Sequence, residues 1–246
     1  MKRNYDTLRI NHDSKTPLAV QLAVNLGLAI REGWWTSDEA LPSERMLSGW
    51  LKLSRVTTRS AYDLLVQEGL AYRRRGAGTF VKHSYEQPLG RLQGFTEAFR
   101  NRGLHPESVW LSKKIDAPTA DEALKLSIAL DVPVLRLRRQ RVVENKPIAY
   151  EVNVLPASVV PEPEKITGSL YDYLDGIGHG LVRAQQHILA MNATEQVAKY
   201  CKIPVGQAVL QVMRIGFDQN NQIIEYSTTY CRSDFYNFTV ELNRNL

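Results

Sequence analysis

The chain has 246 residues, enough for two domains, and its 43% hydrophobic and 23% charged residues are typical of a soluble globular protein. Its formal net charge of +5 lies entirely in residues 1–84, which hold 13 Lys/Arg and 8 Asp/Glu, whereas residues 85–246 hold 18 of each. No window has the roughly 18 unbroken apolar residues of a membrane helix, and no apolar core follows the basic N-terminus, so we expect a cytoplasmic protein without a signal peptide.

Residues 17–81 predict three helices followed by a hairpin. The helices cover about residues 17–32, 43–52 and 54–69 and start at proline or serine, and Gly33 and Gly69 are plausible stops for the first and the third. Within each helix, apolar residues recur at steps of three and four, which predicts one buried stripe. The second and third helices are short and meet at a tight turn, a pattern typical of a helix–turn–helix.

The third helix has one face for the core and another for solvent. Thr58, Ala61, Tyr62 and Leu65 share the core face, and Arg55, Val56 and Arg59 lie on or beside the opposite face. The two arginines are one turn apart, so both can reach one major groove or its flanking phosphates, and Val56 can cover a thymine methyl group. A solvated helix face is the alternative for each arginine alone, but their place in the second helix of the motif favours DNA.

A basic hairpin follows. Residues 70–75 and 79–81 predict two strands joined by Gly76-Ala77-Gly78, where glycine permits a positive φ. Arg73, Arg74 and Arg75 near the tip suit phosphate contacts, which carry little sequence information. Charged protection of a sheet edge is the alternative, but it does not account for three consecutive arginines beside a glycine turn.

The same residues carry the skeleton PL–Q…I–G…LPSER…L…SR–T–R…L–EGL…R–G–GTFV. This segment resembles the winged-helix domain of the GntR family of bacterial transcription regulators, which implies a winged helix-turn-helix DNA-binding domain over residues 1–81. The resemblance implies DNA contacts from Arg45, Ser54, Arg55, Thr57, Arg59 and Gly76, to which the residue pattern adds Val56, Arg73 and Arg75. Two positions depart from the family: Thr58 replaces an aliphatic residue, and Trp34-Trp35 replace a more polar turn.

Residues 82–90 are polar, with Gln87-Pro88 breaking any regular element, and predict a linker to a second domain over residues 91–246. That domain contains a faint repeat of helix, strand, asparagine turn and strand, in copies 73–75 residues apart. Alternating runs at 134–142 and 209–217 predict antiparallel hairpins. Two copies of one unit favour a single sheet with a pocket between related halves.

Three local clusters are placed to line this pocket. Residues 94–97 lie just before a helix, where free amides and a hydroxyl can hold an anion, and residues 168–171 open another helix. Between them, one strand carries Arg136 and Arg138 on one face and Arg139 and Arg141 on the other. The alternatives are two ordinary helix caps and a surface row of ion pairs.

The order of these clusters is similar to that of the UTRA effector domain of the HutC subfamily, over about residues 90–243. The similarity implies an α+β, chorismate-lyase-like fold with a mainly antiparallel six-stranded sheet, and a small anionic effector such as a sugar phosphate or a carboxylate. The positions that match effector-holding residues are Phe95, Thr96, Arg139, Arg141, Glu151, Ser169, Tyr171 and Glu225. One position departs: Cys231, beside Tyr230, stands where many members have tyrosine.

The sequence therefore predicts a ligand-responsive transcription regulator, a repressor that binds a near-palindromic operator as a homodimer and is released by its effector. The alternatives are a lyase-like enzyme and a non-specific nucleic-acid binder. The five histidines are scattered without a nucleophile–base pair, and the neutral second half does not suit a non-specific binder. Cys201 and Cys231 lie far outside metal-ligand spacing, so we expect reduced thiols and no metal or cofactor.

Overall fold

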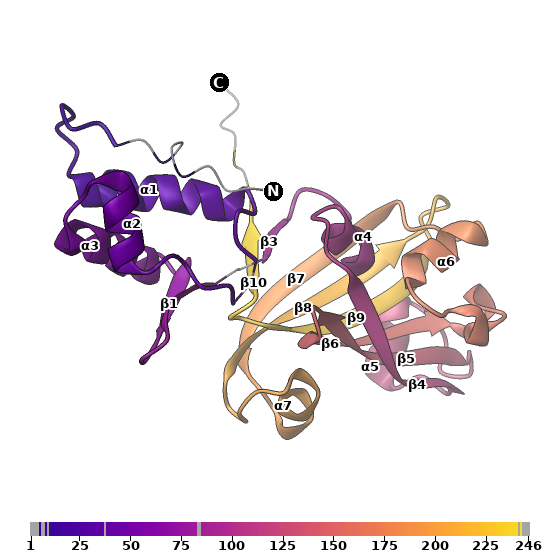
Figure 1. The fold of residues 1–246 in the computed structure, drawn as a ribbon. Coiled ribbons are helices and arrows are strands. Elements are labelled where there is room, and N and C mark those ends of the chain that lie inside the picture. The colour runs from indigo at the N-terminus through magenta and orange to yellow at the C-terminus, as the bar shows by residue number, and fades with distance from the viewer. Residues whose placement is uncertain are drawn as a thin grey trace. The chain divides into compact units, whose positions relative to one another are not determined.

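The computed structural model describes residues 5, 8, 10–36, 38–82, 85–240 and 242. The chain divides into two compact units, Met1–Ser84 and Tyr85–Leu246 (Figure 1). Over the described ranges, no helix combines the length and the apolar character that crossing a membrane requires.

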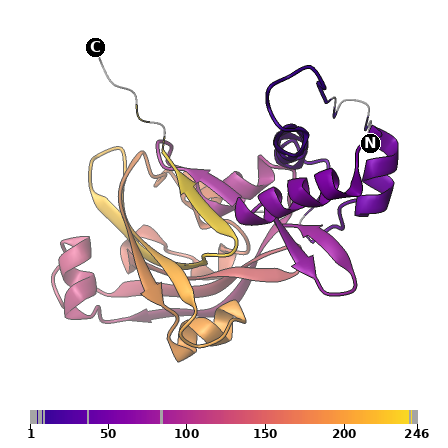
Figure 2. The ribbon, with the colours of Figure 1, turned by 90° about the vertical axis from the view of Figure 1, so that its left-hand side faces the viewer.

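The first unit is a three-helix domain with a hairpin. Its elements in chain order are α1 (Leu18–Arg31), α2 (Glu44–Leu51), α3 (Arg55–Gln67), β1 (Ala71–Arg74) and β2 (Gly78–Val81). These bounds confirm the predicted helices and strands to within about two residues. The helices pack around a core that includes Leu22, Leu26, Leu47, Tyr62 and Leu65. The antiparallel β1–β2 hairpin extends beyond the helices as a wing (Figure 2).

The α3 helix begins with a side-chain cap that also accounts for one departure in the sequence. Ser54 Oγ accepts a hydrogen bond from the Thr57 amide at 3.0 Å, which satisfies one free donor of the first turn. Thr58 is fully buried, and its hydroxyl donates to the Ser54 carbonyl at 3.3 Å. Since this hydroxyl has a partner, the threonine leaves no unsatisfied polar group in the core.

The second unit is built on one six-stranded antiparallel sheet with the strand order β4-β5-β6-β9-β8-β7. The strands are β4 (Pro106–Asp116), β5 (Val134–Val143), β6 (Lys146–Pro156), β7 (Arg183–Asn192), β8 (Ala208–Phe217) and β9 (Ile223–Arg232). The helices are α4 (Phe95–Arg100), α5 (Ala120–Leu126), α6 (Leu170–Gly176) and α7 (Glu195–Cys201), with 3-10 turns at Ala157–Val159 and Pro163–Lys165. The predicted α+β class and the six-stranded sheet are confirmed.

The internal repeat is visible in the sheet order. A helix and a hairpin, α5-β5-β6, recur as α7-β8-β9, and β6 and β9 lie side by side at the centre of the sheet. Asn153 and Ser227 occupy equivalent places in the two copies and face each other across the β6–β9 ladder. The two halves are therefore related by an approximate two-fold axis near this pair.

Helices cover both faces of the sheet. The apolar residues of α4 and α6 pack on the face that holds Leu137, Ala149 and Cys231. Those of α5 and α7 pack on the opposite face, against residues such as Tyr150 and Val154 (Figure 1).

The segment expected to be an irregular linker contains a short strand. β3 (Tyr85–Pro88) pairs in parallel with β10 (Tyr236–Thr239), so the expectation that no regular element forms at 82–90 is wrong over these four residues. Proline is tolerated at the end of a strand that has a single neighbour, where it interrupts no central ladder. The following residue, Leu89, donates its amide to the Thr239 carbonyl at 2.8 Å and extends the pairing.

Candidate nucleic-acid interface and ligand pocket

The outward face of α3 presents a mixed apolar and basic surface. Val56 is 75% exposed, and the exposed Arg55 side chain has no hydrogen bond or ion pair with any part of the chain that the structure describes. Arg59 differs, because its guanidinium donates to Glu44 of α2 through Nη2 at 3.0 Å and Nε at 3.1 Å. This hydrogen bond raises the pKa of Arg59.

The wing also has arginines that contact other side chains and one that does not. Arg73 lies 2.7 Å from Asp63 and 3.9 Å from Glu44, and Arg74 stacks 4.4 Å from the centre of the Phe80 ring. Arg75, at the turn, has no polar partner within the described ranges. Gly76 adopts a φ of +75°, the conformation for which the glycine turn was predicted.

The arginines predicted to bind DNA are therefore of two kinds. Arg45, Arg55 and Arg75 point to solvent without partners among the described residues, whereas Arg59 and Arg73 share the carboxylate of Glu44. Ser54 and Thr57 are joined at 2.8 Å between their hydroxyls at the start of α3. Sequence reasoning missed Glu44, whose only signal is an acid in the first turn of α2.

In the second unit, a buried ion-pair cluster lies across β5 and β6. Arg139 and Glu151 are register partners, and Arg139 Nε donates to Glu151 Oε2 at 2.5 Å. Arg141 Nε lies 2.8 Å from the same oxygen without the alignment of a hydrogen bond. Burial alone would raise the pKa of Glu151, but the charges of Arg139 and Arg141 outweigh it and lower that pKa to about 2. Burial and the nearby charge of Arg139 lower the pKa of Arg141 to about 10.

Aromatic rings flank both arginines. The Arg139 guanidinium carbon lies 4.9 Å from the centre of the Trp110 ring, and that of Arg141 lies 4.4 Å from the Phe95 ring. Arg141 also donates to Ser108 Oγ at 2.7 Å. Cation–π contacts and this hydrogen bond hold both guanidinium groups on the sheet face that carries α4 and α6.

The second repeat contributes a related set of groups. Glu225 is fully buried and accepts hydrogen bonds from Asn153 Nδ2 at 2.7 Å and from the Tyr171 hydroxyl at 2.9 Å. Arg214 Nη1 donates to the Tyr171 hydroxyl at 3.0 Å, and two other nitrogens of its guanidinium contact Gln186. Burial raises the pKa of Glu225, and the positive charge of Arg214 opposes this shift.

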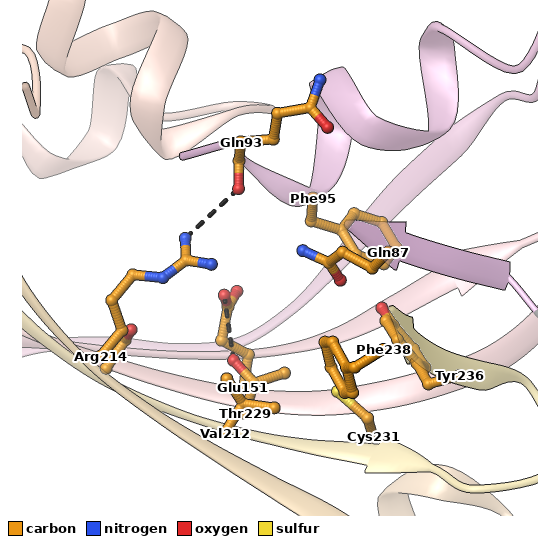
Figure 3. Close-up of a pocket in the computed structure, with 11 residues that line it drawn as sticks. Gln87, Gln93, Phe95, Glu151, Val212, Arg214, Thr229, Cys231, Tyr236 and Phe238 are labelled. Atoms are coloured by element: carbon orange, nitrogen blue, oxygen red, sulfur yellow. Dashed lines mark hydrogen bonds between the residues drawn. The ribbon is translucent and has the colours of Figure 1, made fainter. Parts of the chain in front are cut away.

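Three of these groups, Phe95, Glu151 and Arg214, line a small cavity (Figure 3). Its volume is about 40 Å³, and it is lined by Gln87, Gln93, Phe95, Glu151, Val212, Arg214, Ser227, Thr229, Cys231, Tyr236 and Phe238. Figure 3 shows the Arg214 guanidinium reaching toward the backbone carbonyl of Gln93, to which it donates at 3.3 Å, and Cys231 below the ring of Phe238. Cys231, the departure noted in the sequence, is thus part of the cavity wall.

Most of the predicted effector residues lie in or near the cavity, but some line it directly and others only contact its lining residues. Phe95 and Glu151 line the cavity itself, and Arg139 and Arg141 join it through Glu151. Tyr171 and Glu225 connect to it through Arg214. Thr96 is buried within α4.

Ser169 has a structural partner. Its hydroxyl accepts from the Asp172 amide and caps α6, as the alternative of an ordinary cap describes. The neighbouring Gly168 carbonyl accepts from Arg139 Nη1 at 3.4 Å, so the loop before α6 still adjoins the arginine cluster.

Sequence reasoning missed Arg214. It occupies β8 at about the place that Arg139 occupies in β5 of the first repeat, and this correspondence is the signal that could have found it. Arg136 lies on the opposite face, where it donates to Glu122 of α5 at 2.8 and 2.6 Å. The arginine row is therefore split between the two faces of the sheet, as its alternation predicts.

Comparison with known proteins agrees with both units. A family model described as "Bacterial regulatory proteins, gntR family" matches residues 18–81, and the UTRA domain model matches residues 101–237. The chain is similar to the HTH-type transcriptional regulator GgaR of Escherichia coli (strain K12), with 30% identity over 233 residues that cover 95% of this chain and 94% of that one. It is also similar to the HTH-type transcriptional repressor NagR of Bacillus subtilis (strain 168), with 31% identity over 96% of this chain and 99% of that one.

A solved structure shares the fold. The crystal structure of PhnF from Mycobacterium smegmatis superposes with a TM-score of 0.72 at 22% identity, over 89% of this chain and 99% of that chain.

Proposed function

Because the chain belongs to the GntR family of bacterial regulatory proteins and carries a UTRA domain, we propose that it is a repressor whose homodimer releases a near-palindromic operator when a small anionic metabolite binds. The chain is a DNA-binding transcription regulator and not an enzyme. The name of the Bacillus subtilis relative, a transcriptional repressor, supports the sign of regulation.

The observation that carries an anionic effector is the excess of arginine around the cavity. Arg139 and Arg141 are buried and Arg214 is half-buried, and the acids beside them in the described part of the chain are Glu151 and Glu225. Three arginines therefore lie near two acidic side chains, and burial raises the pKa of one of these acids, Glu225. A buried positive charge without a counter-ion is costly, and a bound anion would remove that cost.

The size of the cavity indicates how such a ligand would enter. A volume of about 40 Å³ is far below the roughly 300 Å³ or more of typical small-molecule sites. Side chains must therefore move, and Glu151, the internal counter-ion, is the group that a ligand anion would replace at Arg139 and Arg141. Under this proposal, effector binding exchanges one carboxylate for another anion at the same two guanidinium groups.

The first unit supports operator recognition. An exposed Val56 beside a free Arg55 suits readout of base edges, and a free Arg75 on the wing suits a phosphate contact. In a homodimer, two α3 helices would enter successive major grooves about 34 Å apart, which is why a near-palindromic site is expected.

The test is fluorescence anisotropy of the full chain on labelled DNA from its own upstream region, titrated with a panel of sugar phosphates and small carboxylates. We expect tight binding to this DNA, weak binding to a scrambled duplex, and reversal by one anionic compound. Equal affinity for both duplexes would contradict operator recognition, and reversal by neutral compounds alone would contradict the anionic effector.

Two arginines of the same strand provide a matched pair of variants. Arg141→Ala removes a member of the buried cluster, whereas Arg138→Ala removes an arginine from the opposite face of β5. We expect both variants to bind the operator like the parent chain, and only Arg141→Ala to lose its response to the compound. An Arg141→Ala protein that responds with normal affinity would remove Arg141 from the effector site.

A further inference from the structure

The second unit has a further and larger cavity, on the face of the sheet opposite to the one that holds Arg139 and Arg141. This groove has a volume of about 580 Å³. β5, β6 and β9 form its floor, and the starts of α5 and α7 form its walls. Typical small-molecule sites have volumes of roughly 300–1,000 Å³. A ligand of that size can therefore enter the groove without the rearrangement that the cavity of about 40 Å³ requires.

Two arginines of β5 lie on the floor of the groove, and they differ in their partners. Arg136 donates to Glu122 at 2.8 and 2.6 Å and lies 3.7 Å from Asp116. These two carboxylates are the acids that line the groove, and both contact Arg136. Arg138 is half-buried, and no residue of the described ranges forms a hydrogen bond or an ion pair with it. Its guanidinium group is therefore available to a ligand.

Two hydroxyl groups of the groove add further donors. The Tyr150 hydroxyl accepts a hydrogen bond from Gln196 Nε2 at 3.3 Å, and the Thr194 hydroxyl accepts one from the Val197 amide at 3.4 Å. Neither hydroxyl donates to another residue that the structure describes, so each keeps its hydrogen for a ligand. Burial raises the pKa of Tyr150, although the positive charge of Arg138 opposes this shift. The phenol therefore stays protonated at neutral pH and can donate.

Stacked aromatic rings hold the floor of the groove in place. The centre of the Tyr150 ring lies 4.8 Å from that of Tyr200 and 5.9 Å from that of Tyr230. The three residues come from β6, α7 and β9, so the stack joins the sheet to the helix that forms one wall. Val197 and Ala198 of α7 are buried against the same face of the sheet. The binding groups therefore have fixed positions before a ligand arrives, which lowers the entropic cost of binding.

We propose that this groove is a second ligand site, which binds a small organic phosphate or carboxylate through the Arg138 guanidinium and the hydroxyls of Tyr150 and Thr194. An oxyanion fits these groups because all of them can donate, and hydrogen bonds between a guanidinium and an anion are roughly twice as strong as neutral ones. A ligand anion also supplies the counter-ion that the half-buried Arg138 lacks among the described residues. The site goes beyond the proposed function, because it lies on the other face of the sheet from the expected effector site and shares no residue with it.

The first test is calorimetric titration of the full chain with three anionic probes: glucose 6-phosphate, adenosine monophosphate and benzoate. Glucose, adenosine and benzyl alcohol are the matched neutral compounds. We expect at least one of the anions to bind with a Kd below about 1 mM, and its neutral match to bind about tenfold more weakly or worse. The two phosphates and the carboxylate separate the two kinds of oxyanion. Binding by none of the three, or equal binding of an anion and its neutral match, would overturn the proposal.

Variants on the two faces of β5 then assign the bound anion to a site. Arg138→Ala should raise its Kd by about tenfold or more, and Tyr150→Phe, which keeps the stacked ring, by about threefold or more. Arg141→Ala is the matched control and should leave this Kd within about twofold, because Arg141 lies on the other face. Loss of binding in Arg141→Ala but not in Arg138→Ala would place the anion in the effector site and overturn the proposal. Operator release by the effector is measured separately, and Arg138→Ala should keep it, so a failure of either proposal is distinguishable from a failure of the other.

Discussion

Glu151 and Glu225 lie on the same face of the sheet but have opposite electrostatic surroundings. Both carboxyl groups are buried, yet Glu151 lies between two guanidinium groups, whereas Glu225 meets the amide of Asn153 and the hydroxyl of Tyr171. The first arrangement stabilises the carboxylate, and in the second burial prevails and favours the protonated acid. Glu151, which lies between the two guanidinium groups, is therefore the carboxylate that a ligand anion is expected to replace.

These two shifts give the second unit a specific pH dependence. Glu225 has a raised pKa, so its contribution to the free energy of unfolding is present below the usual value of 4.5 and is lost as the pH rises through the folded-state value. As the pH falls through the folded-state value toward 4.5, we expect the parent chain to gain stability relative to Glu225→Gln. Urea unfolding of both proteins at a series of pH values measures this difference, and a difference that does not change with pH would contradict the assignment.

At lower pH the sign reverses. Glu151 has a lowered pKa, so its contribution is present above 4.5 and is lost as the pH falls toward about 2. This loss should appear equally in the parent chain and in Glu225→Gln, because both retain Glu151, and the shared loss serves as the internal control.

Two free arginines of the first unit should affect DNA binding in different ways. Arg55→Ala should cost about 1–3 kcal/mol of specific binding and reduce discrimination between operator and random DNA, because Arg55 lies on the outward face of α3. Arg75→Ala, on the wing, should weaken binding to both duplexes alike and lower the salt slope by about one. Salt titrations on the two duplexes separate these effects. Unchanged discrimination in Arg55→Ala would remove it from base readout.

At the scale of single residues, the sequence could indicate which arginines matter but not what holds them. Arg59 is fifteen residues from Glu44 along the chain, and no local pattern predicts their ion pair. Arg214 has an equally remote set of contacts, with Gln93 and Tyr171. Such partners are chosen by the packing of distant elements, which a single sequence does not encode locally.

The helices and strands could be predicted from the sequence wherever a helix cap or a regular spacing of apolar residues indicated them. Ser43, Ser54 and Thr194 each accept a backbone hydrogen bond at the start of a helix, and the core face of α3 is buried as its spacing predicts. β3 was missed because it is four residues long and its partner, β10, lies about 150 residues away. Gln87 of β3 and Phe238 of β10 both line the cavity. The first strand of the second unit therefore also contributes to the cavity wall.

At the scale of the whole molecule, the repeat explains why two related acid–base sets lie on one face of the sheet. An approximate two-fold axis near Asn153 and Ser227 places Arg139 and Glu151 on one side, and Arg214 and Glu225 on the other. The repeat was detectable from the sequence because helix starts and asparagine turns recur at a constant interval. The different surroundings of the two halves were not detectable from the sequence, since they arise from the residues that α4 and α6 contribute.

Release of DNA by an effector also sets a quantitative condition on the molecule. If the compound that reverses operator binding acts on the UTRA unit, its coupling to DNA must be reciprocal, because both affinities describe one thermodynamic cycle. A coupling of about 1–3 kcal/mol would weaken DNA binding by roughly 5- to 150-fold, and operator DNA must weaken effector binding by the same factor. Calorimetric titration of the compound into the free protein and into the protein–operator complex measures the second factor, and anisotropy measures the first. Equal factors would support two separate sites that favour different arrangements of one chain, whereas a compound that binds both forms with equal affinity cannot release DNA through the pocket around Arg139 and Arg141.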